Sequence, residues 1–277
     1  MNMYKTIASR QNPLVKEVCA LSQKKHRCGQ EAFRFDGKKL FLEAIECRIP
    51  LKLIILRCDK EAEFSELCQR ATDENLVSRD GIVTVTDEVF EKLSEEKSPE
   101  GVMCVAAFLP SLHKKLSAQE AALALGESER VLIAESLRDP GNLGTIMRSC
   151  AALGIDRLIM TDDCTDIYSQ KTLRAAMGAI FRQKTLTVAA NELPELISLL
   201  RERGRRIYAT ALHRDARLIG EIELEHTDAF VIGNEGHGLS EAVIDACDAC
   251  AVIPMAENAE SLNASAAAAI CIWETVR

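Results

Sequence analysis

The sequence predicts an α/β protein built from two domains, and three observations support this fold class. The chain has 277 residues, which is more than one hydrophobic core usually organises. Its composition, with 47% hydrophobic and 27% charged residues, is that of an ordinary globular protein. Short apolar runs alternate with amphipathic stretches, which is typical of strands that alternate with helices. We expect a first domain over residues 1–108, a linker over 109–128 and a second domain over 129–277.

The first domain shows a mixed pattern of helices and strands. Asn12-Pro13 precedes a run with apolar residues at helical spacing, and a short strand at 33–35 ends at Asp36-Gly37. Residues 38–47 have a helical pattern. Compact apolar runs that are typical of buried strands lie at residues 51–56, 82–85 and 101–108.

The second domain shows a more regular alternation. Apolar runs predict strands at residues 131–135, 157–160, around 209, 229–232 and 251–253. Helices are expected between them, and an alanine-rich helix over 261–276 closes the chain. Strands that alternate with helices predict a parallel sheet covered on both faces. The stretch at 109–128 contains Pro110 and Gly126 and is expected to connect the two domains, in part as a helix.

Positive charge is concentrated at the start of the chain, and this indicates which kind of partner the protein could bind. The net charge is −8, but residues 1–39 hold nine Lys and Arg against three acidic residues, a net charge of +6. Such a segment suggests a contact with a polyanion, and a solvated basic helix is the alternative. A cluster of four arginines at 201–206 could add phosphate contacts. No apolar run is long enough to span a membrane.

The cysteines and histidines give no sign of a metal or redox site. The eleven cysteines are scattered, and without an apolar leader sequence they predict reduced thiols in the cytoplasm. Cys247 and Cys250 form a single C-x-x-C pair without a second pair, so buried thiols are favoured over a zinc site. The histidines lie in no known motif. His237 is the best candidate among them because it lies in a glycine-rich loop.

A first candidate motif, RDPGNLGTIMR at residues 138–148, follows a predicted strand and opens a helix. Asp139-Pro140-Gly141 is typical of a turn, and Asn142 can cap the helix behind it. The apolar spacing places Arg148 on the exposed face of this helix. Because the turn lies at the carboxyl edge of the sheet, where open α/β sheets bind ligands, a binding site is expected there. A plain capped surface helix is the alternative.

Two further motifs follow predicted strands in the same way. The stretch VIGNEGHGLS at 231–240 has three glycines, which let a ligand approach the backbone, and it contains Glu235. It matches neither a dinucleotide fingerprint nor a phosphate-binding P-loop, which argues against a nucleotide-dependent oxidoreductase. The stretch IPMAENAESLN at 253–263 ends at a helix start, where Ser261 and Asn263 supply a hydroxyl and an amide. Ser261 alone is more typical of a helix cap.

The three motifs in this order resemble those of the SpoU, or TrmH-like, branch of the SPOUT RNA ribose 2'-O-methyltransferases. This resemblance covers residues 129–277. The segments around 9–16 and 33–37 are similar to the amino-terminal substrate-binding domain of many members, which has a fold like that of ribosomal protein L30e. The resemblance implies an L30e-like α/β domain followed by a SPOUT α/β domain with a carboxyl-terminal trefoil knot. It also implies a homodimer formed through the SPOUT domain.

The resemblance further implies S-adenosylmethionine as the cofactor and RNA as the substrate, and we expect that RNA to be 23S rRNA. The positions that match the functional residues of the family are Asn142, Arg148, Glu235, Ser261 and Asn263. Those that match its cofactor contacts are Thr210, Gly233, Ile253 and Leu262. One position departs from the family, because Glu257 stands where glycine is usual. No metal is implied.

Arg148 has two possible roles. It could act as a base that removes the proton of the ribose hydroxyl, or as a clamp that binds a neighbouring phosphate and places the ribose. Its guanidinium has a pKa above about 12, so it is a reluctant base, and we expect it to bind a phosphate and stabilise developing charge. Two alternatives to an rRNA methyltransferase remain at this stage. One is the same reaction on tRNA, and the other is a non-catalytic RNA-binding protein on the same scaffold, for which Glu257 is the only supporting feature.

Overall fold

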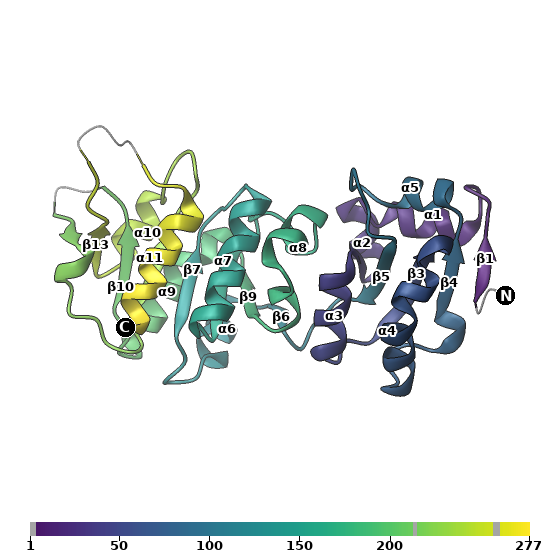
Figure 1. Ribbon diagram of the computed structural model, residues 1–277. Coiled ribbons are helices and arrows are strands. Elements are labelled where there is room, and N and C mark those ends of the chain that lie inside the picture. The colour runs from purple at the N-terminus through teal and green to yellow at the C-terminus, as the bar shows by residue number, and fades with distance from the viewer. Residues whose placement is uncertain (1–3, 213–214, 257–260) are drawn as a thin grey trace. The chain divides into compact units, whose positions relative to one another are not determined.

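The computed structural model describes residues 4–212, 215–256 and 261–277 of the chain. Their contacts group them into two compact units (Figure 1). The first unit runs to Leu109 and includes Tyr168–Leu173, and the second holds the other described residues. Both units are α/β, so the predicted fold class is confirmed.

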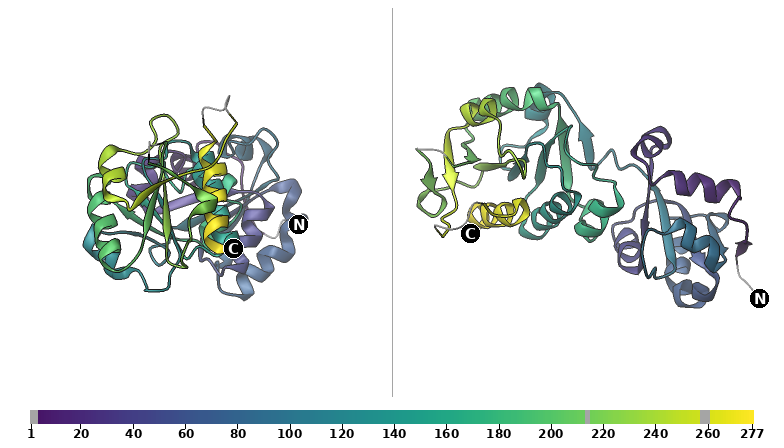
Figure 2. Two further views of the ribbon diagram at one scale, coloured as in Figure 1. Left: turned by 90° about the vertical axis from the view of Figure 1, so that its left-hand side faces the viewer. Right: turned by 90° about the horizontal axis from the view of Figure 1, so that it is seen from above.

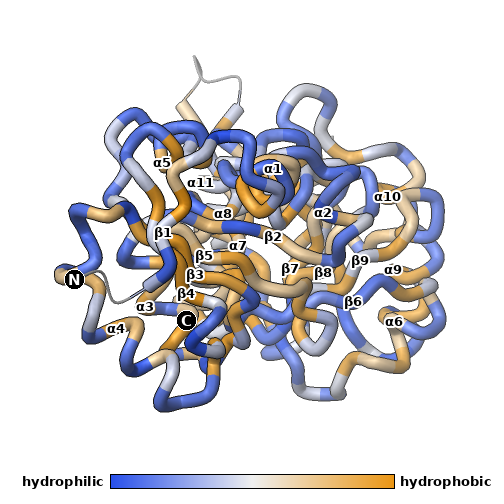
Figure 3. The backbone as a smooth tube through the Cα atoms, turned by 90° about the vertical axis from the view of Figure 1, so that its right-hand side faces the viewer, coloured by the Kyte–Doolittle hydropathy of each residue, from blue (hydrophilic) through white to orange (hydrophobic). Residues whose placement is uncertain are grey.

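The first unit has a five-stranded sheet with the order β1-β4-β3-β5-β2. β1, β4 and β3 run parallel, whereas β5 is antiparallel to both β3 and β2. The hydrophobic tube segments in Figure 3 include β3, β4 and β5, whose residues are almost all buried. The elements are β1 (Lys5–Ile7), α1 (Pro13–Ala20), α2 (Lys24–Gln30), β2 (Ala32–Asp36), α3 (Lys38–Glu46), β3 (Leu51–Arg57), η1 (Cys58–Lys60), α4 (Glu61–Asp73), η2 (Arg79–Gly81), β4 (Ile82–Val85), α5 (Asp87–Leu93) and β5 (Val102–Ala107).

Local sequence explains where these elements begin. Asn12 caps α1 by accepting a hydrogen bond from the backbone N–H of Leu14 at 2.9 Å, and Pro13 occupies the first helical position. Two of the nine basic residues at the start of the chain, Arg27 and Arg34, are buried and donate hydrogen bonds to backbone carbonyls. The polyanion contact expected of this segment therefore has to involve the other seven cations, which are exposed.

The second unit has an eight-stranded sheet in which every neighbouring pair is parallel, in the order β11-β13-β10-β12-β7-β8-β9-β6. The elements are β6 (His113–Lys115), α6 (Ala118–Ala124), β7 (Val131–Ala134), α7 (Pro140–Leu153), β8 (Arg157–Thr161), η3 (Ala179–Phe181), β9 (Lys184–Val188), η4 (Ala190–Glu192), α9 (Leu193–Glu202), β10 (Ile207–Thr210), β11 (Arg217–Leu218), η5 (Ile219–Glu221), β12 (Ala229–Ile232), α10 (Glu241–Ala246), β13 (Ala249–Val252) and α11 (Ala264–Val276). The helix α8 (Gln170–Ala176) belongs to the first unit up to Leu173 and to the second unit after it.

Helices cover both faces of this sheet, as the sequence predicted. α6, α9 and α10 pack together on one face, and α7 and α11 pack against each other on the other (Figure 2). The first of these layers buries a core of strand residues such as Ile133 and Val231 against Leu196 and Leu200 of α9. The trefoil knot stays a prediction.

Three details of the second unit differ from the sequence prediction. In the expected linker at 109–128, α6 agrees with the predicted helical part and starts with a capping box at Ser117, but β6, which pairs with β9, was not predicted. β9 itself was missed because its alternating threonines dilute the apolar signal. The last helix begins at Ala264 rather than Ser261, because the side chain of Asn263 caps it by accepting from the backbone N–H of Ser265 at 2.9 Å.

Candidate active site at the carboxyl edge of the second sheet

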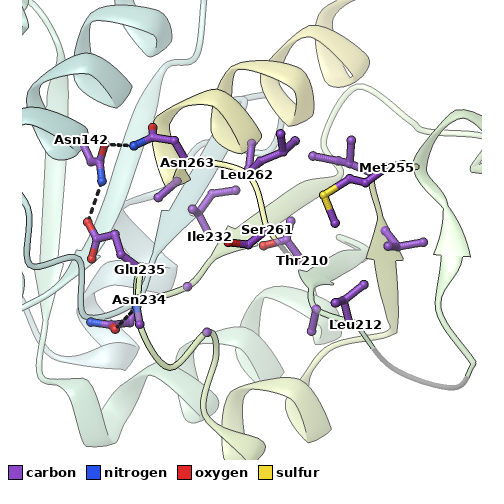
Figure 4. Close-up of a pocket in the computed structure, with 18 of the residues that line it drawn as sticks. Asn142, Thr210, Leu212, Ile232, Asn234, Glu235, Met255, Ser261, Leu262 and Asn263 are labelled. Atoms are coloured by element: carbon purple, nitrogen blue, oxygen red, sulfur yellow. Dashed lines mark hydrogen bonds between the residues drawn. The ribbon is translucent and has the colours of Figure 1, made fainter. Parts of the chain in front are cut away.

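The second unit contains a cavity of about 870 Å³ at the carboxyl edge of its sheet. Loops that follow β7, β12 and β13 meet there, because the parallel strands bring their carboxyl ends to one edge (Figure 4). Eight of the nine predicted site residues line this cavity: Asn142, Thr210, Gly233, Glu235, Ile253, Ser261, Leu262 and Asn263. The three motifs therefore converge on one pocket.

A chain of hydrogen bonds joins one residue from each motif. The side-chain amide of Asn263 donates to Oδ1 of Asn142 at 2.9 Å. Nδ2 of Asn142 then donates to Oε1 of Glu235 at 3.0 Å (Figure 4). Since Asn142 is only 8% exposed, its amide has few other partners, and the chain fixes its orientation.

Glu235 lies at the exposed rim of the cavity and connects the second motif to the first. Its two oxygens also accept hydrogen bonds from the backbone N–H groups of Arg138 at 3.1 Å and Asp139 at 3.2 Å. Partial burial raises the pKa of Glu235, but the hydrogen bonds from Asn142 and from these backbone groups outweigh it and lower the pKa. The group is therefore an ionised acceptor that holds two loops together at neutral pH, rather than a proton donor.

The start of α7 differs from the sequence prediction. Asp139, not Asn142, is the N-cap, because its Oδ1 accepts from the backbone N–H of Asn142 at 2.8 Å. Asn142 lies one turn further on, so its side chain is available for Glu235 and Asn263. The signal that could have identified the cap is the pair Asp139-Pro140, since proline favours the first position of a helix and aspartate the cap before it.

The glycine-rich loop is a tight turn in which two backbone segments touch. Asn234 and Gly238 exchange backbone hydrogen bonds of 2.9 Å, and Gly238 has a φ of +70°. A Cβ on Gly233 would lie 2.5 Å from the carbonyl carbon of Gly238, so only glycine fits there. The side chain of Asn234, which the sequence analysis did not single out, donates to the carbonyl of Ser136 at 2.7 Å and accepts from the backbone of Gly236 and His237.

Apolar side chains form part of the wall of the cavity. Leu212, Ile232 and Met255 line it together with the predicted contacts Ile253 and Leu262. Thr210, at the end of β10, donates its hydroxyl hydrogen to the carbonyl of Val231 at 2.7 Å. Glu257, the position at which the sequence departs from the family, lies outside the residues that the structure describes.

Arg148 does not line the cavity. It lies on α7, about one and a half turns after Asn142, and its side chain is exposed. Within the described ranges no hydrogen bond or ion pair holds its guanidinium.

The arginines at 201–206, which the sequence suggested as phosphate contacts, are all engaged in contacts within the second unit. Arg201 pairs with Asp248 at 2.9 Å, and Arg206 pairs with Asp228 at 2.6 Å. Arg203 donates to the carbonyls of Ala122 and Leu125. Arg205 is 5% exposed and donates to four backbone carbonyls, those of Gly126, Glu127, Glu129 and Thr227. These carbonyls occupy the terminal donors of Arg205, whereas Arg201 and Arg206 each keep, beside their ion pairs, an Nη group that no other described residue uses.

Other chemistry is not found in the parts of the chain that the structure describes. Cys247 and Cys250 are buried, and burial raises the pKa of both thiols, as in unreactive structural cysteines. Among the described residues, no group of three or more His, Cys, Asp or Glu could hold a metal ion. No described helix is both long and apolar enough to cross a membrane.

The residues of the large cavity fit a medium-sized, positively charged ligand with an apolar part. Its volume of about 870 Å³ lies within the ~300–1,000 Å³ typical of small-molecule sites. The described lining includes two carboxylates, Asp139 and Glu235, and no Lys or Arg. The apolar walls suit an aromatic base, and the absence of lining cations suits a sulfonium.

Comparisons with known proteins agree with this geometry. Residues 129–273 match the SpoU rRNA Methylase family, and residues 12–104 match the MRM3-like substrate binding domain. The chain is 30% identical to the 23S rRNA (guanosine(2553)-2'-O)-methyltransferase RlmP of Bacillus subtilis (strain 168), over 97% of this chain and 98% of RlmP.

Solved structures show the same architecture over nearly the whole chain. An AdoMet-bound rRNA methyltransferase from Sinorhizobium meliloti has a TM-score of 0.80 and 27% identity, over 98% of this chain and 97% of that one. An RNA 2'-O ribose methyltransferase has a TM-score of 0.78 and 27% identity, with the same coverage.

The fold and the pocket thus define an α/β methyltransferase of the SPOUT class. The chain belongs to the SpoU rRNA methylase family. The enzyme class and cofactor expected from the sequence, an RNA ribose 2'-O-methyltransferase that uses S-adenosylmethionine, are those of this family and are confirmed.

Proposed function

We propose that this protein methylates a ribose 2'-hydroxyl of 23S rRNA. The observation that carries the proposal is the hydrogen-bonded chain of Asn263, Asn142 and Glu235 at the edge of the large cavity. The choice of 23S rRNA rests on RlmP, which acts on that RNA and aligns with this chain over nearly its full length. The amino-terminal match to a substrate-binding domain supports a large, structured RNA as substrate.

The large cavity holds the cofactor, with Thr210, Gly233, Ile253 and Leu262 in contact with it. S-adenosylmethionine supplies a methyl group on a sulfonium when bound. Ser261 and Asn263 orient the ribose next to that methyl group, and Asn142 fixes Asn263 through the 2.9 Å hydrogen bond. Glu235 keeps the glycine turn against the first motif. Positioning of this kind can supply about 7–11 kcal/mol of a reaction barrier.

Arg148 binds a phosphate of the RNA rather than removing the proton of the hydroxyl. Its place outside the cavity lining, and its exposed guanidinium, support a clamp. The variant Arg148→Lys keeps the positive charge but loses the planar fork of donors. We expect it to raise the KM for RNA about tenfold or more, and near-normal turnover with a normal KM would refute the clamp.

The active form is a homodimer assembled through the second unit in the cytoplasm. Trp273 on α11 is 55% exposed, and α11 packs against α7, the helix that carries Arg148. A large exposed aromatic side chain on an alanine-rich helix is typical of a surface that a partner covers. A second copy of this chain would cover it beside the active-site helix. The trefoil knot that the family resemblance implies belongs to the same proposal.

The substrate is tested by incubating the purified protein with labelled S-adenosylmethionine and either 23S rRNA or tRNA transcripts. We expect label in 23S rRNA, at one ribose that resists alkaline cleavage. Mapping of 2'-O-methyl groups in cells with and without the gene then identifies the nucleotide. Label in tRNA alone would replace rRNA by tRNA as the substrate. Cofactor binding without label in either RNA would overturn the proposal.

A further inference from the structure

A second cavity, of about 470 Å³, lies beside the cofactor cavity. It is formed by the loop after β7 and the glycine-rich loop after β12. Its lining residues are Glu135, Ser136, Arg138, Asn234, His237, Gly238, Leu239 and Ser240. Asn234 and Gly238 line both cavities, so the same glycine turn borders the cofactor and this second space. Its volume is within the range of sites that bind a small molecule or a single nucleotide.

The groups that this cavity offers to a ligand are hydrogen-bond donors. Its one lining carboxylate, Glu135, is 7% exposed and accepts from the backbone N–H and the hydroxyl of Ser240 at 3.0 and 2.6 Å. In contrast, the side chain of Arg138 is 62% exposed. His237 is also exposed, and no side-chain hydrogen bond of its ring occurs among the described residues.

Arg138 is held in place without using up its donors. Its Nη1 donates to the carbonyl of Asp163 at 2.7 Å and its Nη2 to Oδ2 of the same residue at 2.8 Å. A guanidinium has five N–H donors, so three remain for a ligand, and the side chain is already ordered before binding. Asn234 joins the glycine-rich loop to the loop after β7 by donating to the carbonyl of Ser136.

The second cavity is also connected by hydrogen bonds to Asn263, Asn142 and Glu235. The backbone N–H of Arg138 donates to Glu235, which in turn accepts from Asn142. A ligand on Arg138 would therefore be linked through Glu235 and Asn142 to Asn263, which orients the ribose in the proposed mechanism. Arginine on a fixed scaffold next to such a site is suited to a phosphate oxygen.

We propose that this second cavity binds a nucleotide of the substrate RNA adjacent to the methylated one, with Arg138 on its phosphodiester and His237 against its base or sugar. The inference rests on the proposed function, because it names a second contact of the same substrate. It assigns to Arg138 and His237 a role in RNA affinity and register, and none in cofactor binding.

The test compares Arg138→Gln and His237→Gln with two matched controls. Arg201 has the same type of contacts as Arg138, one carboxylate and one backbone carbonyl, but it precedes β10 at the opposite edge of the sheet. His226 is an exposed histidine that precedes β12. The Arg201→Gln and His226→Gln variants therefore control for loss of charge and of an imidazole away from the cavity.

The Kd for a 23S rRNA fragment is measured at several salt concentrations, and the Kd for S-adenosylmethionine is measured by calorimetry. We expect Arg138→Gln to weaken RNA binding about tenfold and to reduce the salt slope by about 1, with cofactor affinity unchanged. Arg138→Lys should restore the salt slope but only part of the affinity. His237→Gln should weaken RNA binding by a smaller factor, and both controls should stay within about twofold of the wild type.

The outcomes separate this inference from the proposed function. Normal methylation by the wild type, with RNA affinity unchanged in both cavity variants, would overturn the inference alone. A parallel loss of cofactor affinity would also overturn it, because the cavity would then be part of the cofactor site. RNA binding that depends on Arg138 without any methylation would instead support the subsite and refute the proposed reaction.

Discussion

At the scale of single residues, the hydrogen bonds from Asn263 to Asn142 and from Asn142 to Glu235 each have a fixed donor and acceptor. We can therefore predict the effect of changing Asn142. Asn142→Asp removes the donor that Glu235 needs and places a second carboxylate beside it. We expect the single-turnover methylation rate to fall at least about 100-fold, because the loops that orient the ribose move apart. Cofactor affinity measured by calorimetry should change only a few-fold.

A second substitution can restore the hydrogen bond between positions 142 and 235 with donor and acceptor exchanged. In the Asn142→Asp/Glu235→Gln variant, the new amide at 235 can donate to the new carboxylate at 142. We expect it to recover part of the rate that Asn142→Asp loses. A double variant no faster than the single one would show that the chain has no role in orientation.

Asp36 in the first unit predicts a dependence of stability on pH. Its carboxyl accepts from Ser94 at 2.9 Å, while its buried Oδ1 has no partner among the described residues. Burial raises the pKa from 3.8 to about 6, although the Ser94 hydrogen bond and Arg34 act in the opposite direction. Because the folded state holds this proton more tightly than the unfolded state, the contribution of Asp36 to stability is largest below pH 3.8 and is lost as pH rises through about 6.

The variant Asp36→Asn removes that penalty. Its free energy of unfolding should exceed that of the wild type by about 1–2 kcal/mol at pH 7.5, and the difference should shrink towards pH 4.5, as urea titrations would measure. At the exposed Asp59, a hydrogen bond from Arg57 lowers the pKa, so Asp59→Asn should give a small change of the opposite sign. A pH-independent effect of Asp36→Asn would contradict the assignment.

At the scale of elements, the glycine turn after β12 predicts which glycine is indispensable. In Gly233→Ala the added Cβ would meet the backbone of Gly238 at 2.5 Å, and the turn would have to open. We expect S-adenosylmethionine binding to weaken more than tenfold, as calorimetry would show. Gly236→Ala is the matched control, because its Cβ would meet only Oδ1 of Asn234 at an ordinary 3.5 Å. Equal affinities in the two variants would refute this reading of the turn.

The same scale shows what the sequence predicts well and what it does not. Apolar runs such as 82–85 and 229–232 became β4 and β12 with the predicted bounds, because a buried strand needs an unbroken apolar stretch. Residues 113–115 are polar and only one of them is partly buried, so β6 gives no such signal and its pairing with β9 depends on tertiary contacts.

The site shows a similar division. The family resemblance carried by the three motifs identified eight residues of the cavity. The motifs meet because parallel strands gather their carboxyl ends at one edge. The sequence did not predict the contacts that the arginines at 201–206 make within the fold. A run of cations in sequence does not reveal that backbone carbonyls and carboxylates of other elements take up its donors, as they do for Arg205. Asn234 and the second cavity likewise depend on loops that meet only in the fold.

At the scale of the whole molecule, the proposed homodimer connects an exposed surface to catalysis. Trp273 is 55% exposed on α11, and α11 packs against the helix that carries both Asn142 and Arg148. An exposed tryptophan at such a position is typical of a residue that anchors an interface between subunits. Replacing such a residue by a charged one weakens subunit association more than its share of the buried area suggests. We therefore expect Trp273→Glu to convert the dimer to a monomer in light scattering and to lose most methylation activity.

Leu123→Glu is the matched control for this change. Leu123 is even more exposed, at 81%, but it lies on α6, which belongs to the helical layer on the opposite face of the same sheet. Introducing the same charge there should leave both the molar mass and the activity unchanged. A Trp273→Glu variant that stays dimeric, or a wild type that is monomeric and fully active, would show that α11 is not the interface.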